Sequence, residues 1–375
     1  MSPRRVVVAP DKFKGSLSAV EVAEAVRRGI LQARPDLEVD LAPVADGGEG
    51  TVEAAIAAGF ERVPVIASGP TGEPVDTAYA RKDETAVVEM ADVSGLGRLP
   101  GGRLDARAAT SRGTGEVIAA ALEAGCRTVV LGIGGSASTD GGAGLVQALG
   151  ARLLDAEGCS VGPGGAALAG IAEVDLSALR SLEGVQVVVA CDVDNPLTGD
   201  HGAAAVYGPQ KGASPADVAD LDAALGRWAD VVAAHTGRDP RETPGAGAAG
   251  GVGFAALALL GAELRPGIDL VLDLVGFDAL AAGADWVVVG EGSFDEQTLH
   301  GKAPVGVAAR ARAASARVAA VCGRCTVDDE RLREAGIERV YALLDEEPDP
   351  VVCMEDAARL LEWVGERMVR DGLFD

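Results

Sequence analysis

Short β-branched runs, each ending at a polar or glycine-rich loop and followed by a helical pattern, recur at both ends of this chain. At the front, residues 5–9 form such a run, Pro10 ends it, and residues 17–32 carry apolar side chains at helical spacing. A second strand and helix follow at residues 38–44 and 52–58. Strands that alternate with helices predict a parallel sheet covered by helices.

The C-terminal end repeats this pattern with three more apolar runs and three more helical segments. The runs are at residues 286–289, 318–321 and 340–344, and the helical segments are at residues 305–314, 329–334 and 354–370. Together with the two strands from the front, these runs predict one doubly wound parallel sheet of five strands. We therefore expect residues 1–65 and 285–375 to form one α/β domain.

The middle of the chain, residues 66–284, has a different pattern and predicts an inserted α/β domain with a mixed sheet. Residues 77–80 and 85–90 alternate like antiparallel strands, whereas residues 128–131 and 185–190 are buried runs. Glycine and proline are dense in the connecting loops. Apolar segments recur between these loops, so the insertion is expected to be compact.

The composition of the chain argues against proteins that bind nucleic acid or acidic membrane surfaces. Only 3% of the 375 residues are aromatic, and the net charge is -24. Such an acidic chain is not expected to bind nucleic acid or an acidic membrane surface, because both need basic patches. The six cysteines are scattered, and no signal peptide or membrane span is apparent. We expect a cytoplasmic protein with reduced thiols and small-molecule substrates.

Five polar loops follow the expected strands, and the carboxyl ends of strands are where open parallel sheets bind ligands. The first loop carries Asp11, Lys12, Lys14 and Ser16 just before a helix. Cationic side chains beside free helix N–H groups favour an anion. The second loop, residues 46–51, combines three glycines with two carboxylates.

The third loop, residues 132–144, opens with the loose dinucleotide pattern G-x-G-x-x-A, and Asp155 follows at the appropriate distance. A nicotinamide-dependent oxidoreductase is therefore one hypothesis. The loop also carries four hydroxyl or carboxylate side chains, Ser136, Ser138, Thr139 and Asp140. These polar groups suit phosphate or a metal-bound nucleotide better than a dinucleotide.

The fourth and fifth loops place carboxylates at strand ends. Asp192 directly follows the run at residues 185–190, and Glu291 and Asp295 follow the run at residues 286–289. Phosphoryl transfer needs a phosphate cradle, Mg²⁺ on carboxylates, cations and a base near the acceptor oxygen. All four are present in these loops, whereas the P-loop, protein-kinase and serine-hydrolase motifs are absent from the sequence.

Eight ordered motifs closely resemble those of the bacterial class I glycerate kinase family. They are APDKFKGSLS at residues 9–18, PVADGGEGT at 43–51, GIGGSASTDGG at 132–142, CDVDNPL at 191–197, YGPQKG at 207–212, PGAGAAGG at 244–251, PGID at 266–269 and GEGSFDEQT at 290–298. The resemblance implies a flavodoxin-like domain interrupted by a second α/β domain. It also implies phosphorylation of D-glycerate by ATP with Mg²⁺, most often at the 2-hydroxyl, with the 3-hydroxyl as the alternative.

Roles for individual residues follow from the motifs and the resemblance together. Asp192 is expected to be the base, and Lys12 or Lys14 to counter phosphate charge. Substrate-binding candidates are Asp46, Gly47, Gly48, Glu49 and Ser16. Candidates for nucleotide and phosphate binding are Gly134, Gly135, Ser136, Ser138, Thr139, Asp140, Lys211, Glu291, Ser293, Asp295 and Gln297. The expected metal ligands are Asp192 and Asp295.

Two questions stay open at the level of sequence. A non-catalytic sensor of a sugar acid would keep the same pocket but tolerate the loss of Asp192. Buried carboxylates without a partner are costly, which favours an enzyme that compensates them with a metal or a cation. A monomer and a homodimer are both compatible with the chain.

Overall fold

The computed structural model describes residues 4–296, 298–300 and 302–375. The chain divides into two compact units. Unit 1 comprises Met1–Asp46, Glu53–Gly59 and Ile268–Asp375, and unit 2 comprises Gly47–Val52 and Phe60–Gly267. These bounds differ from residues 66 and 284, because the strand β3 (Glu61–Ser68) pairs within the sheet of unit 2 and Val271 and Phe277 pack into a core of unit 1.

Unit 1 contains a parallel sheet of five strands in the described part of the chain. The strands are β1 (Arg5–Pro10), β2 (Glu38–Leu41), β11 (Trp286–Phe294), β12 (Arg317–Cys325) and β13 (Arg339–Ala342), in the order β13-β12-β11-β1-β2. This is the flavodoxin-like order, in which the first and third strands of the sheet are neighbours. The structure confirms the expected α/β class.

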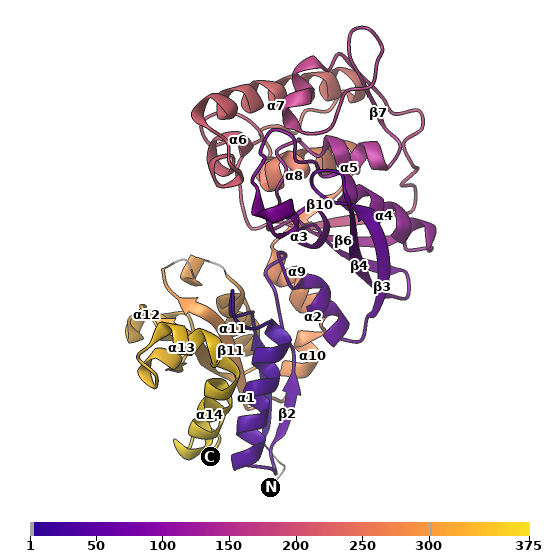
Figure 1. The fold of residues 1–375 in the computed structure, drawn as a ribbon. Helices are drawn as coiled ribbons and strands as arrows, with labels where there is room; N and C mark the ends of the chain where they lie inside the picture. Colours follow the sequence, from indigo (N-terminus) through magenta and orange to yellow (C-terminus); the bar gives the residue numbers. More distant parts are fainter. Residues whose placement is uncertain (1–3, 297, 301) are drawn as a thin grey trace. The chain divides into compact units, whose positions relative to one another are not determined.

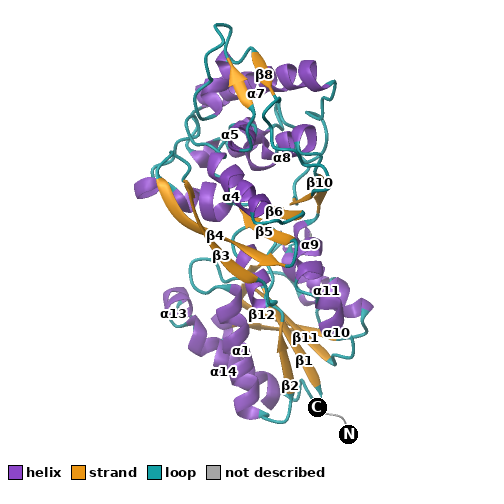
Figure 2. Cartoon of the chain, turned by 90° about the vertical axis from the view of Figure 1, so that its right-hand side faces the viewer, coloured by secondary structure: helices purple, strands orange, loops and turns teal. Residues whose placement is uncertain are grey.

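Helices cover both faces of this sheet, as Figure 2 shows for α1 and α14 on one side and α10 and α11 on the other. The helical segments of unit 1 are α1 (Ala19–Ala33), α2 (Thr51–Ala57), α9 (Gly267–Leu274), α10 (Phe277–Ala281), α11 (Ala303–Ala313), α12 (Asp329–Glu334), α13 (Pro350–Glu355) and α14 (Ala357–Arg370), with short 3-10 turns η5 (Thr298–His300) and η6 (Leu343–Asp345). The first residues of α2 and α9 belong to unit 2.

Alternate residues of the central strands enter two separate cores. Val7 of β1 and Val287 of β11 pack with α11, whereas Val6 and Val288 pack with α1 and α14. Side chains alternate between the two faces of a strand, so a strand buried on both faces needs an unbroken apolar run. This explains why central strands such as β1 and β11 contain uninterrupted runs of apolar residues.

Two expectations about unit 1 need correction. β11 and β12 do not end at residues 289 and 321 but continue to Phe294 and Cys325, because Ser293 and Phe294 still pair with Arg324 and Cys325. The single helix expected at residues 354–370 is divided into α13 and α14. Ser16 donates a hydrogen bond to the carbonyl of Met354 at 2.6 Å, which occupies an acceptor that a continuous helix would use.

Unit 2 contains a mixed sheet of six strands in the order β10-β9-β6-β5-β4-β3. The strands are β3, β4 (Pro74–Lys82), β5 (Thr85–Glu89), β6 (Thr128–Gly132), β9 (Gln186–Ala190) and β10 (Glu263–Arg265), with a separate pair, β7 (Arg152–Leu154) and β8 (Glu173–Asp175). β3, β4 and β5 are antiparallel, and β5, β6, β9 and β10 are parallel.

Figure 1 shows the ribbon of the helices of unit 2, which pack around a large apolar core. They are α3 (Ala91–Ser94), α4 (Arg112–Glu123), α5 (Ala143–Ala148), α6 (Ala203–Tyr207), α7 (Pro215–Thr236) and α8 (Ala248–Leu259), with 3-10 turns η1 (Leu96–Arg98), η2 (Pro100–Gly102), η3 (Gly165–Gly170) and η4 (Pro209–Lys211). Trp228 of α7 and Phe254 of α8 meet edge to face within this core. None of the described helices has the length and apolar character needed to span a membrane.

Candidate active site

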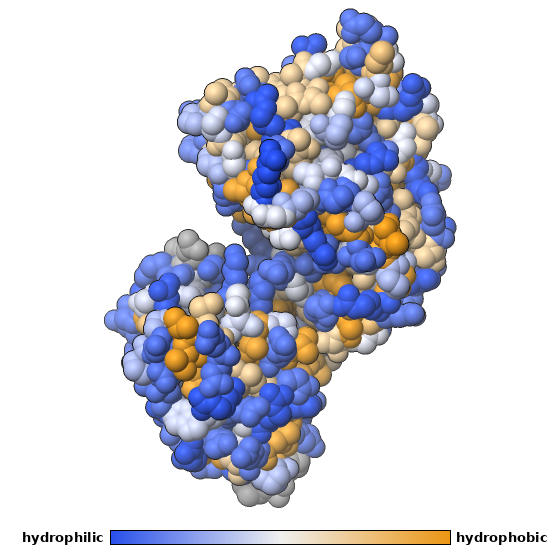
Figure 3. Space-filling view, in the orientation of Figure 1, coloured by the Kyte–Doolittle hydropathy of each residue, from blue (hydrophilic) through white to orange (hydrophobic). Residues whose placement is uncertain are grey.

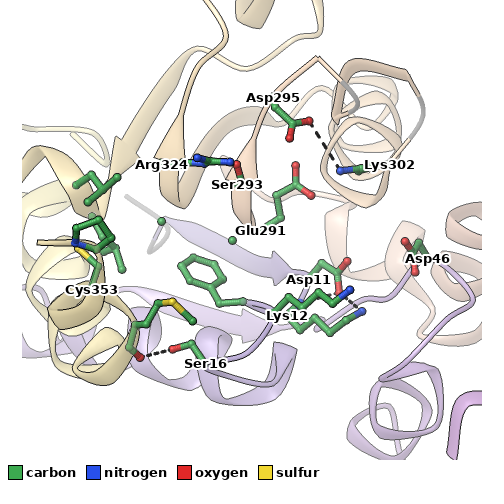
Figure 4. A pocket seen from close by; sticks show the side chains of 18 residues that line it. Asp11, Lys12, Ser16, Asp46, Glu291, Ser293, Asp295, Lys302, Arg324 and Cys353 are labelled. Carbon is green, nitrogen blue, oxygen red and sulfur yellow. Dashed lines mark hydrogen bonds and ion pairs between the residues drawn. The ribbon is translucent and has the colours of Figure 1, made fainter. Parts of the chain in front are cut away.

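A pocket of about 570 Å³ lies in unit 1 at the carboxyl ends of β1, β11 and β12 (Figure 4). β1 leads to α1 on one face of the sheet, and β11 leads to α11 on the other face. The two strands therefore form the point where the winding of the sheet reverses, which is the usual ligand position in this fold. The lining residues are Asp11, Lys12, Phe13, Lys14, Ser16, Asp46, Glu291, Gly292, Ser293, Asp295, Lys302, Gly323, Arg324, Leu343, Leu344, Pro350, Cys353 and Met354.

Asp11 and Lys12 follow β1 directly and form an ion pair, with Nζ of Lys12 at 3.7 Å from Oδ1 of Asp11. The same carboxylate accepts a hydrogen bond from the backbone N–H of Lys12 at 2.6 Å. Burial nevertheless raises the pKa of Asp11 to about 6, because water is excluded from the carboxylate and Asp46 adds negative charge. The pocket thus holds a carboxylate whose charge is only partly compensated.

Glu291 of β11 is the second buried carboxyl of this pocket, with 8% of its surface exposed. Its carboxylate accepts a hydrogen bond from the hydroxyl of Thr298. Burial, with smaller contributions from the charges of Asp11 and Asp295, raises the pKa of Glu291 to about 7, against the lowering effects of the hydrogen bond from Thr298 and the charge of Lys302. A bound cation would relieve this crowding of negative charge.

Asp295 lines the same pocket, and Nζ of Lys302 is 3.9 Å from its Oδ1 (Figure 4). Asp46 and Ser293 also line the pocket. The structure therefore brings together in unit 1 candidate residues from three separate loops of the sequence. Gln297 lies outside the described residues.

Lys14 and Ser16 lie in the loop between β1 and α1. Lys14 is exposed and lines the pocket. The hydroxyl of Ser16 donates to the carbonyl of Met354, so it joins this loop to α13. A direct contact of Ser16 with substrate stays a prediction.

Several lining residues were not singled out by sequence reasoning. Arg324 lies on β12, and its guanidinium donates to the hydroxyl of Ser293 at 2.8 Å. Leu343, Leu344 and Met354 add apolar surface. They come from β12, η6 and α13, segments that match no phosphate-binding pattern. Only the folded structure brings these segments to the pocket next to the loop after β1.

Unit 2 gathers a second group of candidates at the carboxyl ends of its parallel strands. Asp192 follows β9, and its Oδ1 accepts a hydrogen bond at 2.8 Å from the backbone N–H of Gly267, which follows β10. The N–H of Gly134, after β6, donates to the carbonyl of Gly47 at 3.3 Å. A Cβ atom on Gly134 would lie 2.7 Å from the Cα of Gly48, so only glycine permits this approach.

The glycine-rich segment 46–51 is held by Glu89 at the end of β5. One carboxylate oxygen of Glu89 accepts hydrogen bonds from the N–H groups of Gly50 and Val52, each at 3.1 Å. These are the free N–H groups at the start of α2. Glu49 is exposed in this segment, so its role in substrate binding stays a prediction.

The hydroxyl-rich loop after β6 is buried. Ser136 is 6% exposed, and Ser138, Thr139 and Asp140 are fully buried. Asp140 accepts hydrogen bonds from the backbone N–H and the hydroxyl of Ser111 at 2.8 and 2.9 Å. It also accepts from the hydroxyl of Thr110 and from the N–H groups of Gly142 and Gly144. Asp140 therefore organises the loop and the start of α4.

Lys211 of η4 supports this loop from inside unit 2. Its side-chain nitrogen donates to the hydroxyl of Ser136 at 2.9 Å and to the carbonyl of Ser138 at 2.5 Å. Burial lowers the pKa of Lys211 to about 7, and Asp140 opposes this by raising it. Contacts between Lys211 and a phosphate stay a prediction, since the side chain is only 2% exposed.

Glycines of the motif PGAGAAGG at residues 244–251 pack against the backbone of the loop after β6. A Cβ atom on Gly250 would lie 2.1 Å from the carbonyl oxygen of Ser138. The carbonyl of Gly250 accepts a hydrogen bond from the N–H of Gly141 at 2.9 Å. This glycine-rich turn thus packs directly on the backbone of the loop after β6.

The carboxylates present suit a magnesium ion that keeps several water or phosphate ligands. Within residues 4–296, 298–300 and 302–375, no three His, Cys, Asp or Glu side chains are grouped closely enough to hold a metal by themselves. Mg²⁺ usually takes one or two protein carboxylates and completes its shell with water and substrate phosphates. Asp295 and Asp46 in unit 1 offer such hard oxygen ligands, and Asp192 offers one in unit 2.

Comparison with known proteins identifies the family. The model of the glycerate kinase family matches residues 6–372 of the chain. The chain belongs to the glycerate kinase family. Glycerate kinase from Bacillus subtilis strain 168 is 45% identical over 372 residues, covering 98% of this chain and 96% of the relative. Glycerate 2-kinase from Escherichia coli K12 is 46% identical over 345 residues, covering 91% and 90%.

A solved structure supports the same assignment. The crystal structure of a Salmonella typhimurium LT2 protein assigned as glycerate kinase 2 is 41% identical, has a TM-score of 0.87 and covers 100% of both chains. This glycerate kinase family member is thus an enzyme of the phosphotransferase class. The expected family resemblance is confirmed.

Proposed function

We propose that the enzyme transfers the γ-phosphate of ATP, with Mg²⁺, to the 2-hydroxyl of D-glycerate and releases 2-phosphoglycerate and ADP. The observation that carries this proposal is the pocket of unit 1, where Asp11, Glu291 and Asp295 meet Lys12 and Lys302 at the reversal point of the sheet. Carboxylates for a metal and cations for phosphate charge are what phosphoryl transfer requires of a protein.

The proposed roles follow the chemistry of each group. Asp192, fixed by the N–H of Gly267, would orient the acceptor hydroxyl and accept its proton. Lys12 and Lys14 would counter the charge of the transferred phosphate. Asp192 and Asp295 would hold the metal, and Asp46, which lines the same pocket as Asp295, would help to position it. When bound, Mg²⁺ supplies charge neutralisation across the phosphate oxygens.

The name of the relative from Escherichia coli, glycerate 2-kinase, supports the 2-hydroxyl as the acceptor. Phosphorylation of the 3-hydroxyl remains the alternative product of the same chemistry. Membership of a kinase family leaves the nicotinamide oxidoreductase without support. The six cysteines are all free thiols, which suits work in the cytoplasm.

A coupled assay of ADP release with ATP, Mg²⁺ and D-glycerate tests the proposal. We expect ADP release that depends on glycerate, and a phosphorus NMR spectrum of the product in which the phosphate is coupled to the single proton on C2. Coupling to the two protons of C3 would instead establish the 3-kinase. Absence of ADP release with glycerate would contradict the proposal itself.

A further inference from the structure

An apolar wall forms part of the pocket in unit 1, and the phosphoryl-transfer chemistry gives it no role. We define this apolar wall as Leu343, Leu344, Pro350, Cys353 and Met354. Leu343 and Cys353 are 1% and 6% exposed, whereas Met354 is 52% exposed. The wall therefore has a packed base and two exposed members, Pro350 and Met354.

The apolar wall and the charged groups lie at different ends of the pocket. In Figure 4, Cys353 lies at one end, and Asp46, Asp295 and Lys302 lie toward the other. Gly292 and Gly323 also line the pocket and contribute backbone without side chains. A ligand that fills the pocket thus meets an apolar surface at one end and charges at the other.

Glycerate cannot make use of the apolar wall. It is a three-carbon acid with two hydroxyl groups, and all of its carbons carry oxygen. The pocket of about 570 Å³ has the size of sites that bind a whole cofactor or nucleotide, which span roughly 300–1,000 Å³. The wall therefore suits the other substrate, whose purine ring is flat and largely apolar on its faces.

We propose that the apolar wall holds the base of the nucleotide, with Met354 against one face of the ring and the phosphates directed toward Lys12 and Lys302. This assignment rests on the proposed use of ATP. The thioether of methionine makes favourable contacts with aromatic rings and adapts to their shape. The nucleotide would then lie along the carboxyl ends of β1, β11 and β12.

The structure holds α13 in position for this role. The hydroxyl of Ser16 donates to the carbonyl of Met354, and Asp349 accepts a hydrogen bond from the N–H of Val351 at the start of the helix. Figure 3 shows apolar side chains gathered on the surface over α13. Val351 and Met354 of α13 are among the large apolar residues that are exposed. Val351 does not line the pocket.

Met354 and Val351 thus form a matched pair for the test, because they are on the same helix and are 52% and 60% exposed. We would measure the affinity for ADP by calorimetry in the wild type, Met354→Gln and Val351→Gln. Met354→Gln should weaken ADP binding about fivefold and raise the KM for ATP, with kcat and the KM for glycerate unchanged. Val351→Gln should match the wild type.

Inorganic tripolyphosphate distinguishes the contribution of the base to binding from the contribution of the phosphates. It carries the charges of ATP but no ring, so its inhibition constant should be the same in the wild type and in Met354→Gln. Equal ADP affinity in the wild type and Met354→Gln, with glycerate-dependent turnover intact, would overturn the assignment of the base alone. A wild type that neither binds ADP nor releases it with glycerate would overturn the proposed function as well.

Discussion

The side-chain nitrogen of Lys211 donates a hydrogen bond to the backbone carbonyl of Ser138 at 2.5 Å, although Lys211 is only 2% exposed. A second hydrogen bond joins the same nitrogen to the hydroxyl of Ser136. The hydroxyls of Ser138 and Thr139 are buried without a hydrogen-bond partner in the structure. Lys211 therefore supplies much of the polar support for the buried loop after β6.

Lys211 should make the stability of the enzyme depend on pH. Burial lowers the pKa of Lys211 from 10.5 to about 7, so between these values the unfolded chain binds more protons than the folded chain. The contribution of Lys211 to the free energy of unfolding therefore rises with pH in this window. Between pH 7 and 9, urea unfolding should show the wild type gaining about 2 kcal/mol relative to Lys211→Met. A difference between the two proteins that is equal at both pH values would contradict this.

Asp140→Asn should destabilise the fold by about 3 kcal/mol, because the buried carboxylate accepts hydrogen bonds from several donors and an amide would turn an N–H group toward them. The free energy of unfolding in urea measures the effect. Asp200→Asn, at an exposed position, serves as the control and should change stability by less than about 0.5 kcal/mol. Equal stability of Asp140→Asn and the wild type would show that the carboxylate does not hold the loop.

Glu291 should lower the stability of the ligand-free enzyme as pH rises. Burial raises the pKa of Glu291 from 4.5 to about 7, so the folded chain binds more protons than the unfolded chain between these values. Its stabilising contribution is complete below about pH 4.5 and is lost as pH rises through about 7. The wild type should lose about 2 kcal/mol relative to Glu291→Gln between pH 5 and 8, as measured by urea unfolding.

The exposed residue Glu330 of α12 provides the control for this measurement, and Glu330→Gln should follow the pH profile of the wild type. Parallel pH profiles for Glu291→Gln and the wild type would mean that Glu291 is charged in the folded chain near pH 5. Its burial would then be compensated by a partner.

Asp192→Asn should reduce kcat about a hundredfold or more, because the amide cannot accept a proton from the acceptor hydroxyl. The fold should stay intact, since the amide oxygen can still accept the hydrogen bond from the N–H of Gly267. Asp194→Asn, at an exposed position in the same loop, should retain normal kcat. Turnover of Asp192→Asn at the rate of the wild type would exclude Asp192 as the base.

Local chain preferences were enough to predict much of unit 1. The alternation of β-branched runs and helical patterns located β1, β2, β11, β12 and β13. The central strands β1, β11 and β12 are buried on both faces and need unbroken apolar sequence, whereas the edge strand β2 has no buried residue. The expected ends of β11 and β12 were wrong, and so was the expectation of a single helix at residues 354–370. These bounds depend on partners distant in sequence: the pairing of β11 with β12, and the hydrogen bond from Ser16 to Met354.

Some features of the candidate site could also be predicted from the sequence, and others could not. Residues with charge or hydroxyl groups at strand ends, such as Asp11, Glu291 and Asp295, could be selected from sequence because parallel strands end at a common edge. The raised pKa values of Asp11 and Glu291 could not be predicted, since desolvation depends on which segments cover a carboxyl group. The apolar wall was also missed, because leucine and methionine carry no local signal of a binding role.

The sequence by itself determined the family, the α/β class and the polar residues available for phosphoryl transfer, because motif order and strand-loop-helix patterns are local properties of the chain. Only the tertiary structure decided which of these residues are accessible. It buried Ser138, Asp140 and Lys211 inside unit 2, and it left Met354 exposed in the pocket of unit 1 that Asp11 also lines. Burial is a property of packing between segments distant in sequence, and it sets both the charge of a side chain and its access to a ligand.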